Sequence, residues 1–137
     1  MKKNTLILLL FITYYSNAQF KATGYFDKEI GISYAFNNKL QTELRINDNL
    51  GIDFNTELSL LYKFVNKSNY NFNTGLGVSF FPFTGADLQS VYLPVQLEIF
   101  PVQNNKNLAL VLESAYHLDD FENGLRNTVG IRYIFNK

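Results

Sequence analysis

The sequence predicts an all-β chain, folded as a closed antiparallel up-and-down barrel of about eight strands. The clearest strand runs from Ile52 to Val65, where even-numbered positions are apolar or Thr and all charged residues occupy odd-numbered positions. At least five further segments repeat this two-residue period, and helical periodicity is absent throughout. Repeated strands with two unlike faces favour a sheet that closes on itself.

The length and composition limit which classes of protein this chain can belong to. The 137 residues, 47% of them hydrophobic, suffice for one domain or a small barrel. Twelve basic and twelve acidic residues cancel, so nothing indicates nucleic acid or another polyanion as a partner. The absence of cysteine excludes a disulfide framework, a thiolate metal site, a cysteine nucleophile and a lipoprotein anchor. No phosphate loop, nucleotide fingerprint or zinc-ligand spacing occurs, so we expect neither cofactor nor metal.

The first eighteen residues have the pattern of a cleaved signal peptide. Lys2 and Lys3 give a positive start, and residues 6–12 form an apolar core too short to span a bilayer. Ser16-Asn17-Ala18 then supplies the small residues that a signal peptidase requires. We therefore expect residues 1–18 to be removed on export and residues 19–137 to form the barrel domain.

The first half of the mature chain contains up to four further strands around the clearest one. Gln19 to Phe26 is weakly patterned and is either a short first strand or a lead-in. In Glu29–Phe36, Leu40–Asn47 and Tyr70–Phe81, even-numbered positions up to 80 are apolar or Thr, whereas odd-numbered ones are mostly polar or small. Each segment therefore predicts a strand with one apolar face.

The second half supplies three more strands. Leu88–Phe100 carries five consecutive odd-numbered apolar residues, and Pro94 within it predicts a bulge or a locally missing ladder bond. Leu108–His117 and Leu125–Phe135 again alternate, the latter with Gly and Arg on its polar face. The sequence thus predicts seven strands with clear alternation, preceded by the weakly patterned segment at 19–26.

Alternation alone does not separate a soluble barrel, apolar inside, from a membrane barrel, apolar outside. The polar face favours the membrane, because its strand bodies contain only one lysine, Lys63, whereas a water-facing surface is normally rich in lysine. It also carries the small residues that a crowded lumen needs: Gly31, Ala35, Gly75, Gly77, Ala109, Ala115 and Gly130. Tyr and Phe gather near strand ends on the apolar face, where interfacial aromatic residues lie in spanning barrels.

The turns show a matching asymmetry. Counted back from a periplasmic C-terminus, the short turns at 37–39, 66–69 and 103–107 fall on one side, and each holds one Lys and no acid. The alternate connections hold the acids Asp27, Asp48, Asp87, Asp119, Asp120 and Glu122. This alternation requires an even number of strands and therefore favours a first strand within 19–26.

The signal sequence, the alternating segments and the closing GIRYIF resemble small eight-stranded outer-membrane β-barrel proteins of Gram-negative bacteria, the OmpA/OmpX-like class. The resemblance implies that Tyr133 and Phe135 form the aromatic-ended signal read by the outer-membrane assembly machinery. Asn136 and Lys137 follow the last aromatic residue, which departs from the usual form.

Charged residues on the polar face form a predicted lumenal network: Glu43, Arg45, Glu57, Glu98, Glu113 and Arg132. The lumen of an eight-stranded barrel is just filled by side chains, so these charges must pair or change protonation state. We expect a network that plugs the barrel; an ion path or a catalytic carboxylate pair is the alternative. Four acids against two bases leave an acidic excess.

His117 is the single histidine, at the loop end of the polar face. A site resembling the histidine–serine–acid arrangement of outer-membrane lipid A deacylases is one hypothesis, but no serine stands at the His-x-Ser position. A hydrogen-bonded structural histidine is the other interpretation. The acidic loop with Asp119, Asp120, Glu122 and Asn123 lacks EF-hand spacing and predicts a solvated, lipopolysaccharide-facing rim.

These observations favour a monomeric outer-membrane barrel with a plugged polar lumen and a structural or surface-interaction role. We expect its partners to be outer-membrane lipid, lipopolysaccharide and the assembly machinery. The alternatives are an outer-leaflet lipid-modifying enzyme, a narrow porin-like pore, and a soluble secreted barrel that binds an apolar ligand.

Overall fold

The computed structural model describes residues 19–49, 53–83, 88–102, 104–119 and 123–135. The predicted signal peptide at residues 1–18 lies outside these ranges. Within the described ranges, no helix is long and apolar enough to cross a membrane.

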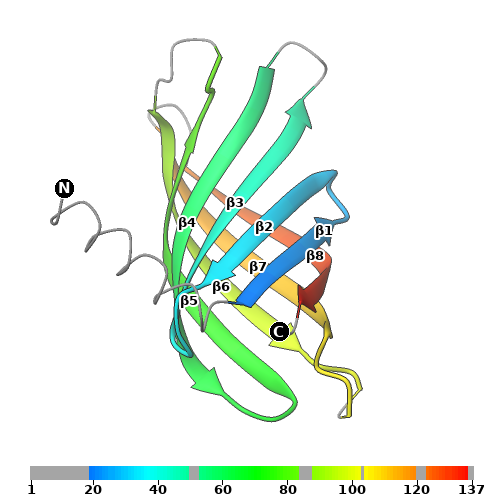
Figure 1. Cartoon of the computed structure of the whole chain (residues 1–137). Coiled ribbons are helices and arrows are strands. Elements are labelled where there is room, and N and C mark those ends of the chain that lie inside the picture. The colour runs from blue at the N-terminus through cyan, green and yellow to red at the C-terminus, as the bar shows by residue number, and fades with distance from the viewer. Residues whose placement is uncertain (1–18, 50–52, 84–87, 103, 120–122, 136–137) are drawn as a thin grey trace, which may run out of the picture.

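Eight antiparallel strands close into a single barrel in sequence order, with β8 returning to pair with β1 (Figure 1). The strands are β1 (Gln19–Tyr25), β2 (Glu29–Ala35), β3 (Leu40–Asn49), β4 (Asp53–Asn66), β5 (Tyr70–Phe80), β6 (Leu88–Ile99), β7 (Leu108–Asp119) and β8 (Gly124–Phe135). The predicted closed antiparallel barrel is confirmed. The weakly patterned segment Gln19–Phe26, which could have been a strand or a lead-in, forms strand β1.

The predicted strand limits are correct to within two residues wherever the chain is described. At Pro94, the pairing of β5 with β6 is interrupted between Thr74↔Val95 and Gly77↔Tyr92 without a change of register, while the pairing with β7 continues. The missing ladder bond is therefore the correct one of the two alternatives. Register shifts occur elsewhere, between Lys63 and Val65 and between Ser79 and Phe80.

The apolar face points outward. Leu58 is 44% exposed on the outer surface, whereas its neighbour Ser59 is 2% exposed inside the barrel. The same contrast holds around the barrel for outward residues such as Ile30, Ile32, Leu44, Leu60, Leu76, Leu93 and Ile131. A soluble barrel has the opposite arrangement, so the alternative of an apolar interior is wrong.

The barrel wall has uneven height. Strands β1 and β2 contain seven residues each, whereas β3 to β8 contain 10 to 14. Figure 1 shows the β1–β2 hairpin ending well below the β3–β4 pair. Phe20 pairs with Phe135 and Gln19 with Ala35, so β1, β2 and β8 end together at the short-turn end. At the loop end β8 extends beyond β1, because it pairs with β7 from Gly124 but with β1 only from Gly130.

Candidate functional site

The barrel lumen holds all six predicted network residues. Glu43, Arg45, Glu57, Glu98, Glu113 and Arg132 are each at most 4% exposed. They come from five strands, β3, β4, β6, β7 and β8, so only the closed barrel brings them together. Every one of these residues takes part in at least one ion pair or charge-assisted hydrogen bond with another lumenal residue.

Arg132 is the centre of the half of the network nearer the short turns. Its guanidinium bonds both Glu98 and Glu43, and its Nε donates to the Thr23 hydroxyl at 2.7 Å. Glu98 is also paired with Lys21, 3.1 Å from its Nζ. Each of the two carboxylates around Arg132 therefore has a second cation, because Glu43 is also bound by Arg45.

Arg45 continues the network toward the loop end. Its Nε donates to Glu43 at 2.5 Å, and its terminal nitrogens bond the carboxylate of Glu113. Arg126 then binds Glu57 in a bidentate pair at 2.6 and 2.8 Å and reaches Glu29 at 3.1 Å. The ion pairs thus form one connected chain along the lumen, as expected for charges withdrawn from water.

Three members of this chain were missed from the sequence. Lys21 lies on the weakly patterned first strand, so the inference that Lys63 is the only lysine on the polar face is wrong: Lys21 is 3% exposed within the lumen. Glu29 and Arg126 have the correct parity but stand at strand ends. With them, the ion pairs in the described chain join five carboxylates and four cations, so the predicted excess of two acids falls to one.

Glycine positions make room for the bulky lumenal rings. A Cβ added to Gly77 would lie 2.2 Å from the Tyr92 ring, and one added to Gly130 would lie 2.8 Å from the Tyr25 ring. The Tyr25 hydroxyl donates to Glu43 at 2.6 Å, and Arg45 lies 4.2 Å over its ring. The small residues predicted for a crowded lumen are therefore adjacent to the side chains that fill it.

An apolar layer lies within the barrel at the short-turn end. Phe100, Ala109 and Ile134 form a buried cluster there, each at most 7% exposed. Uncharged side chains thus lie between the Lys21–Glu98–Arg132 group and the short-turn end of the barrel.

The loop end contains a polar cavity of about 400 Å³ beside His117. His117 Nδ1 lies 3.2 Å from the Ser90 hydroxyl, which is 2.7 Å from the Ser79 hydroxyl. The His117 ring stacks on Tyr92 with centroids 4.8 Å apart. The serine absent from the His-x-Ser position is therefore supplied by the neighbouring strand β6, a contact set by the pairing of Tyr92 with His117.

The structure describes only part of the predicted acidic rim at Asp119–Asn123. Residues 120–122 and the side chain of Asp119 lie outside the described part of the chain, and Asn123 is exposed. Among the described residues, no group of three or more His, Cys, Asp or Glu side chains is arranged to hold a metal ion.

The outer surface carries aromatic pairs at the short-turn end. Tyr133 and Phe135, the predicted assembly signal, both point outward with ring centroids 5.0 Å apart. Tyr62 and Phe64 form a similar pair on β4, and Phe20, Tyr34 and Phe36 form contacts of the same kind on β1 and β2. These positions match the expected interfacial girdle.

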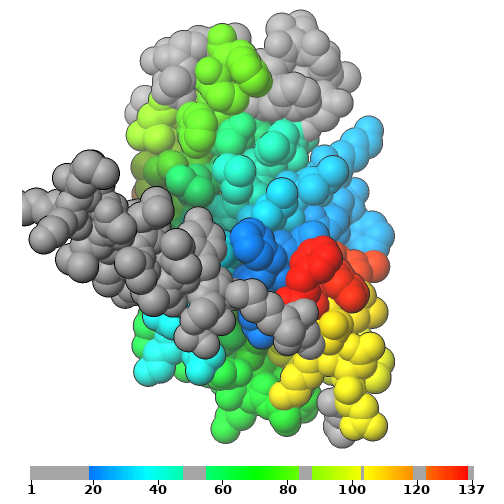
Figure 2. All heavy atoms as spheres, viewed as in Figure 1, coloured from blue at the N-terminus to red at the C-terminus, as the bar shows by residue number. Residues whose placement is uncertain are grey.

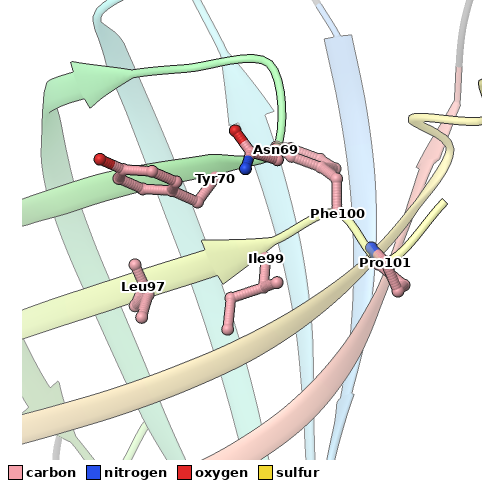
Figure 3. Close-up of a pocket in the computed structure, with 6 residues that line it drawn as sticks. All are labelled: Asn69, Tyr70, Leu97, Ile99, Phe100 and Pro101. Carbon is pink, nitrogen blue, oxygen red and sulfur yellow. The ribbon is translucent and has the colours of Figure 1, made fainter. Parts of the chain in front are cut away.

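An outward groove of about 490 Å³ lies at the same end, between β5 and β6. Figure 3 shows Tyr70, Leu97 and Ile99 along this groove, with Phe100 and Pro101 beyond the end of β6. Phe100 N donates to the carbonyl of Asn69 at 2.8 Å, which continues the pairing of β5 with β6 beyond Tyr70 and Ile99. The groove is part of the apolar outer surface, and it lacks a charged or catalytic group.

Comparisons with known proteins identify the fold. No protein-family model matches the chain, and the search of curated proteins gave no match. Among solved structures, a barrel described as "De novo design of transmembrane beta-barrels" superposes with a TM-score of 0.56 at 14% identity, covering 86% of this chain and 92% of that one.

The N-terminal β-barrel domain of Pseudomonas aeruginosa OprF superposes with a TM-score of 0.52 at 11% identity, covering 86% of this chain and 95% of that domain. At these identities the likeness concerns the fold. The chain has the fold of a small eight-stranded transmembrane β-barrel.

Proposed function

We propose that this protein is a small outer-membrane barrel whose lumen is plugged and whose role is structural or one of surface interaction. The apolar outer face and the aromatic pairs support a location in a bilayer, because a lipid-facing surface needs an apolar band flanked by aromatic residues. The observation that carries the plugged lumen is the connected chain of ion pairs from Lys21 to Glu57. Its members are at most 4% exposed, except Arg126 at the loop end, whose side chain is 26% exposed.

A conducting pore needs a continuous path of water, and two features oppose one here. Arg132 and Arg45 cross the lumen to bond carboxylates from other strands, and the layer of Phe100, Ala109 and Ile134 lies beyond them. We therefore expect no ion conduction through the native barrel. The same packing gives a rigid body that presents its loops at the cell surface.

Two measurements test this proposal. Fractionation should place the mature chain in the outer membrane, and the unheated protein should migrate faster on electrophoresis than the boiled protein. Recovery from the soluble periplasm would remove the membrane location. In planar bilayers the inserted protein should give no conductance steps, and regular ion-selective steps would contradict the plugged lumen.

A second candidate function is hydrolysis of a lipid ester at the outer leaflet, and the Ser90–His117 contact favours it. A nucleophilic serine needs a base within hydrogen-bond reach and a third group that orients the base. Within the described residues His117 Nε2 has no hydrogen-bond partner, so that third group is missing and this function ranks second. Release of fatty acid from lipid A by the wild type but not by Ser90→Ala would establish it.

A further inference from the structure

The uneven wall leaves a gap above the turn between β1 and β2, beside residues Gly124–Thr128 of β8, and this gap is called the notch. A strand needs about 9–11 residues to span a bilayer, and β2 has seven. At a tilt of about 40°, seven residues rise about 18 Å, less than the apolar band of about 25 Å. The notch therefore lies at the height of the outer leaflet, provided that the barrel occupies a membrane as proposed above.

One side of the notch is an unpaired sheet edge. Residues Gly124 to Thr128 of β8 pair with β7, whereas the pairing of β8 with β1 starts at Gly130, and Val129 accepts from Phe26 N. Within the described chain, no strand covers the other edge of Gly124–Thr128. An open edge in hydrocarbon leaves backbone groups without hydrogen bonds, which is unfavourable because lipid supplies no donors or acceptors.

Exposed apolar side chains surround this edge. Phe26, Ile30 and Leu125 flank the notch and are 73%, 67% and 64% exposed. Figure 2 shows the blue surface of the β1–β2 hairpin ending below the lime-coloured surface near the end of β5. Apolar side chains thus face the lipid where the wall is lowest.

The polar cavity lies directly behind the notch. Gly124, Leu125 and Arg126 of the open edge belong to its lining. The lining of the cavity therefore includes both the unpaired edge and the side chains of Ser90 and His117.

The cavity's polar groups indicate which headgroup it suits. Asn55 Oδ1, His117 Nε2 and Arg126 Nε are buried without a hydrogen-bond partner in the described structure, and they include an acceptor as well as a donor. Arg126 is already paired with Glu57 and Glu29, so its charge is matched and two carboxylates would repel an anion. Hydroxyl groups, which both donate and accept, suit this set and the open backbone edge.

We propose that this cavity binds the uncharged, hydroxyl-rich headgroup of an outer-leaflet lipid, which reaches it sideways through the notch while its chains stay in the bilayer. Asn55, Ser90 and His117 contact the headgroup, and Phe26 and Leu125 contact the start of the chains. The proposal rests on the membrane location put forward above and adds a ligand class to it.

The single histidine makes the test direct. The protein is inserted in phosphatidylcholine nanodiscs, insertion is verified by heat-dependent migration, and the His117 ring signals are followed by NMR. Decyl glucoside is titrated as the uncharged probe, with glucose and decyl phosphate for comparison. We expect a saturable shift with decyl glucoside and at least about tenfold weaker binding of the other two. Glucose lacks the chain that holds the headgroup in the bilayer, and decyl phosphate lacks the sugar hydroxyl groups, of which one or two hydrogen bonds account for about tenfold.

Two variants and one control variant locate the site. Asn55→Leu should weaken decyl glucoside binding about tenfold, whereas Asn73→Leu, which alters a buried lumenal Asn outside the cavity lining, should leave it unchanged. Phe26→Glu should weaken binding of decyl glucoside but not of glucose.

An inserted protein without a saturable shift, equal binding of glucose, preference for decyl phosphate, or an unaffected Asn55→Leu variant would each overturn the proposal and leave the membrane location standing. Failure to insert would overturn both.

Discussion

Arg132→Met is the most informative single perturbation of the lumen. Arg132 is 0% exposed and binds two carboxylates, Glu98 and Glu43, together with the Thr23 hydroxyl. Methionine fills much of the same volume but leaves both acids without this partner. Removing one member of a buried ion pair costs about 3–5 kcal/mol, because the remaining charge stays away from water.

The contacts that Glu43 and Glu98 keep in Arg132→Met decide where in this range of about 3–5 kcal/mol the loss of unfolding free energy should fall. Glu43 keeps Arg45 and the Tyr25 hydroxyl, and Glu98 keeps Lys21 and Asn71. Neither acid is left without a cation, so we expect the lower end, about 3 kcal/mol. Adding Glu98→Gln to Arg132→Met should recover part of it, with an interaction energy of about 0.5–3 kcal/mol between the two changes.

The assay is urea unfolding in lipid vesicles, followed by far-ultraviolet circular dichroism. Glu57→Gln is the matched control, because Glu57 is equally buried but pairs with Arg126 and shares no direct partner with Arg132. Its effect should add to that of Arg132→Met within about 0.5 kcal/mol. Additive losses for Arg132→Met with Glu98→Gln would refute the network, since uncoupled residues contribute independently.

Three further outcomes follow from the packing. Leu58→Trp should be tolerated on the outer face, whereas Leu61→Trp, at a 0% exposed lumenal site on the same strand, should lose about 1–3 kcal/mol of unfolding free energy in vesicles; equal effects would contradict the assigned faces. Gly77→Val should also lose about 1–3 kcal/mol by overlap with the Tyr92 ring, and adding Tyr92→Ala should recover part of it; a silent Gly77→Val would oppose the crowded lumen. If the C-terminal aromatic residues are the assembly signal, Phe135→Ala should slow insertion by purified assembly machinery more than Phe64→Ala, the equivalent change in the Tyr62–Phe64 pair, and equal rates would contradict that role.

Seven of the eight strands, and the two faces of each, could be predicted from the amino-acid sequence. Alternation is a local property, because successive side chains of a strand point to opposite sides whatever the strand pairs with. Leu58 and Ser59 could therefore be assigned to opposite faces from their positions alone, and the small residues at Gly77 and Gly130 indicated a crowded interior. The six predicted lumenal charges followed from the same parity.

Which of these residues contact one another depends on how the strands pair and close into a barrel. Lys21 and Glu98 are 77 positions apart, and their contact across the lumen depends on closure of the sheet. Ser90 approaches His117 because of the register between β6 and β7, whereas the expected motif was sought along one strand. The notch is likewise a property of the assembled wall: the seven residues of β2 become a gap only when longer neighbours stand beside them, since strand length is local but barrel height is shared by all eight strands.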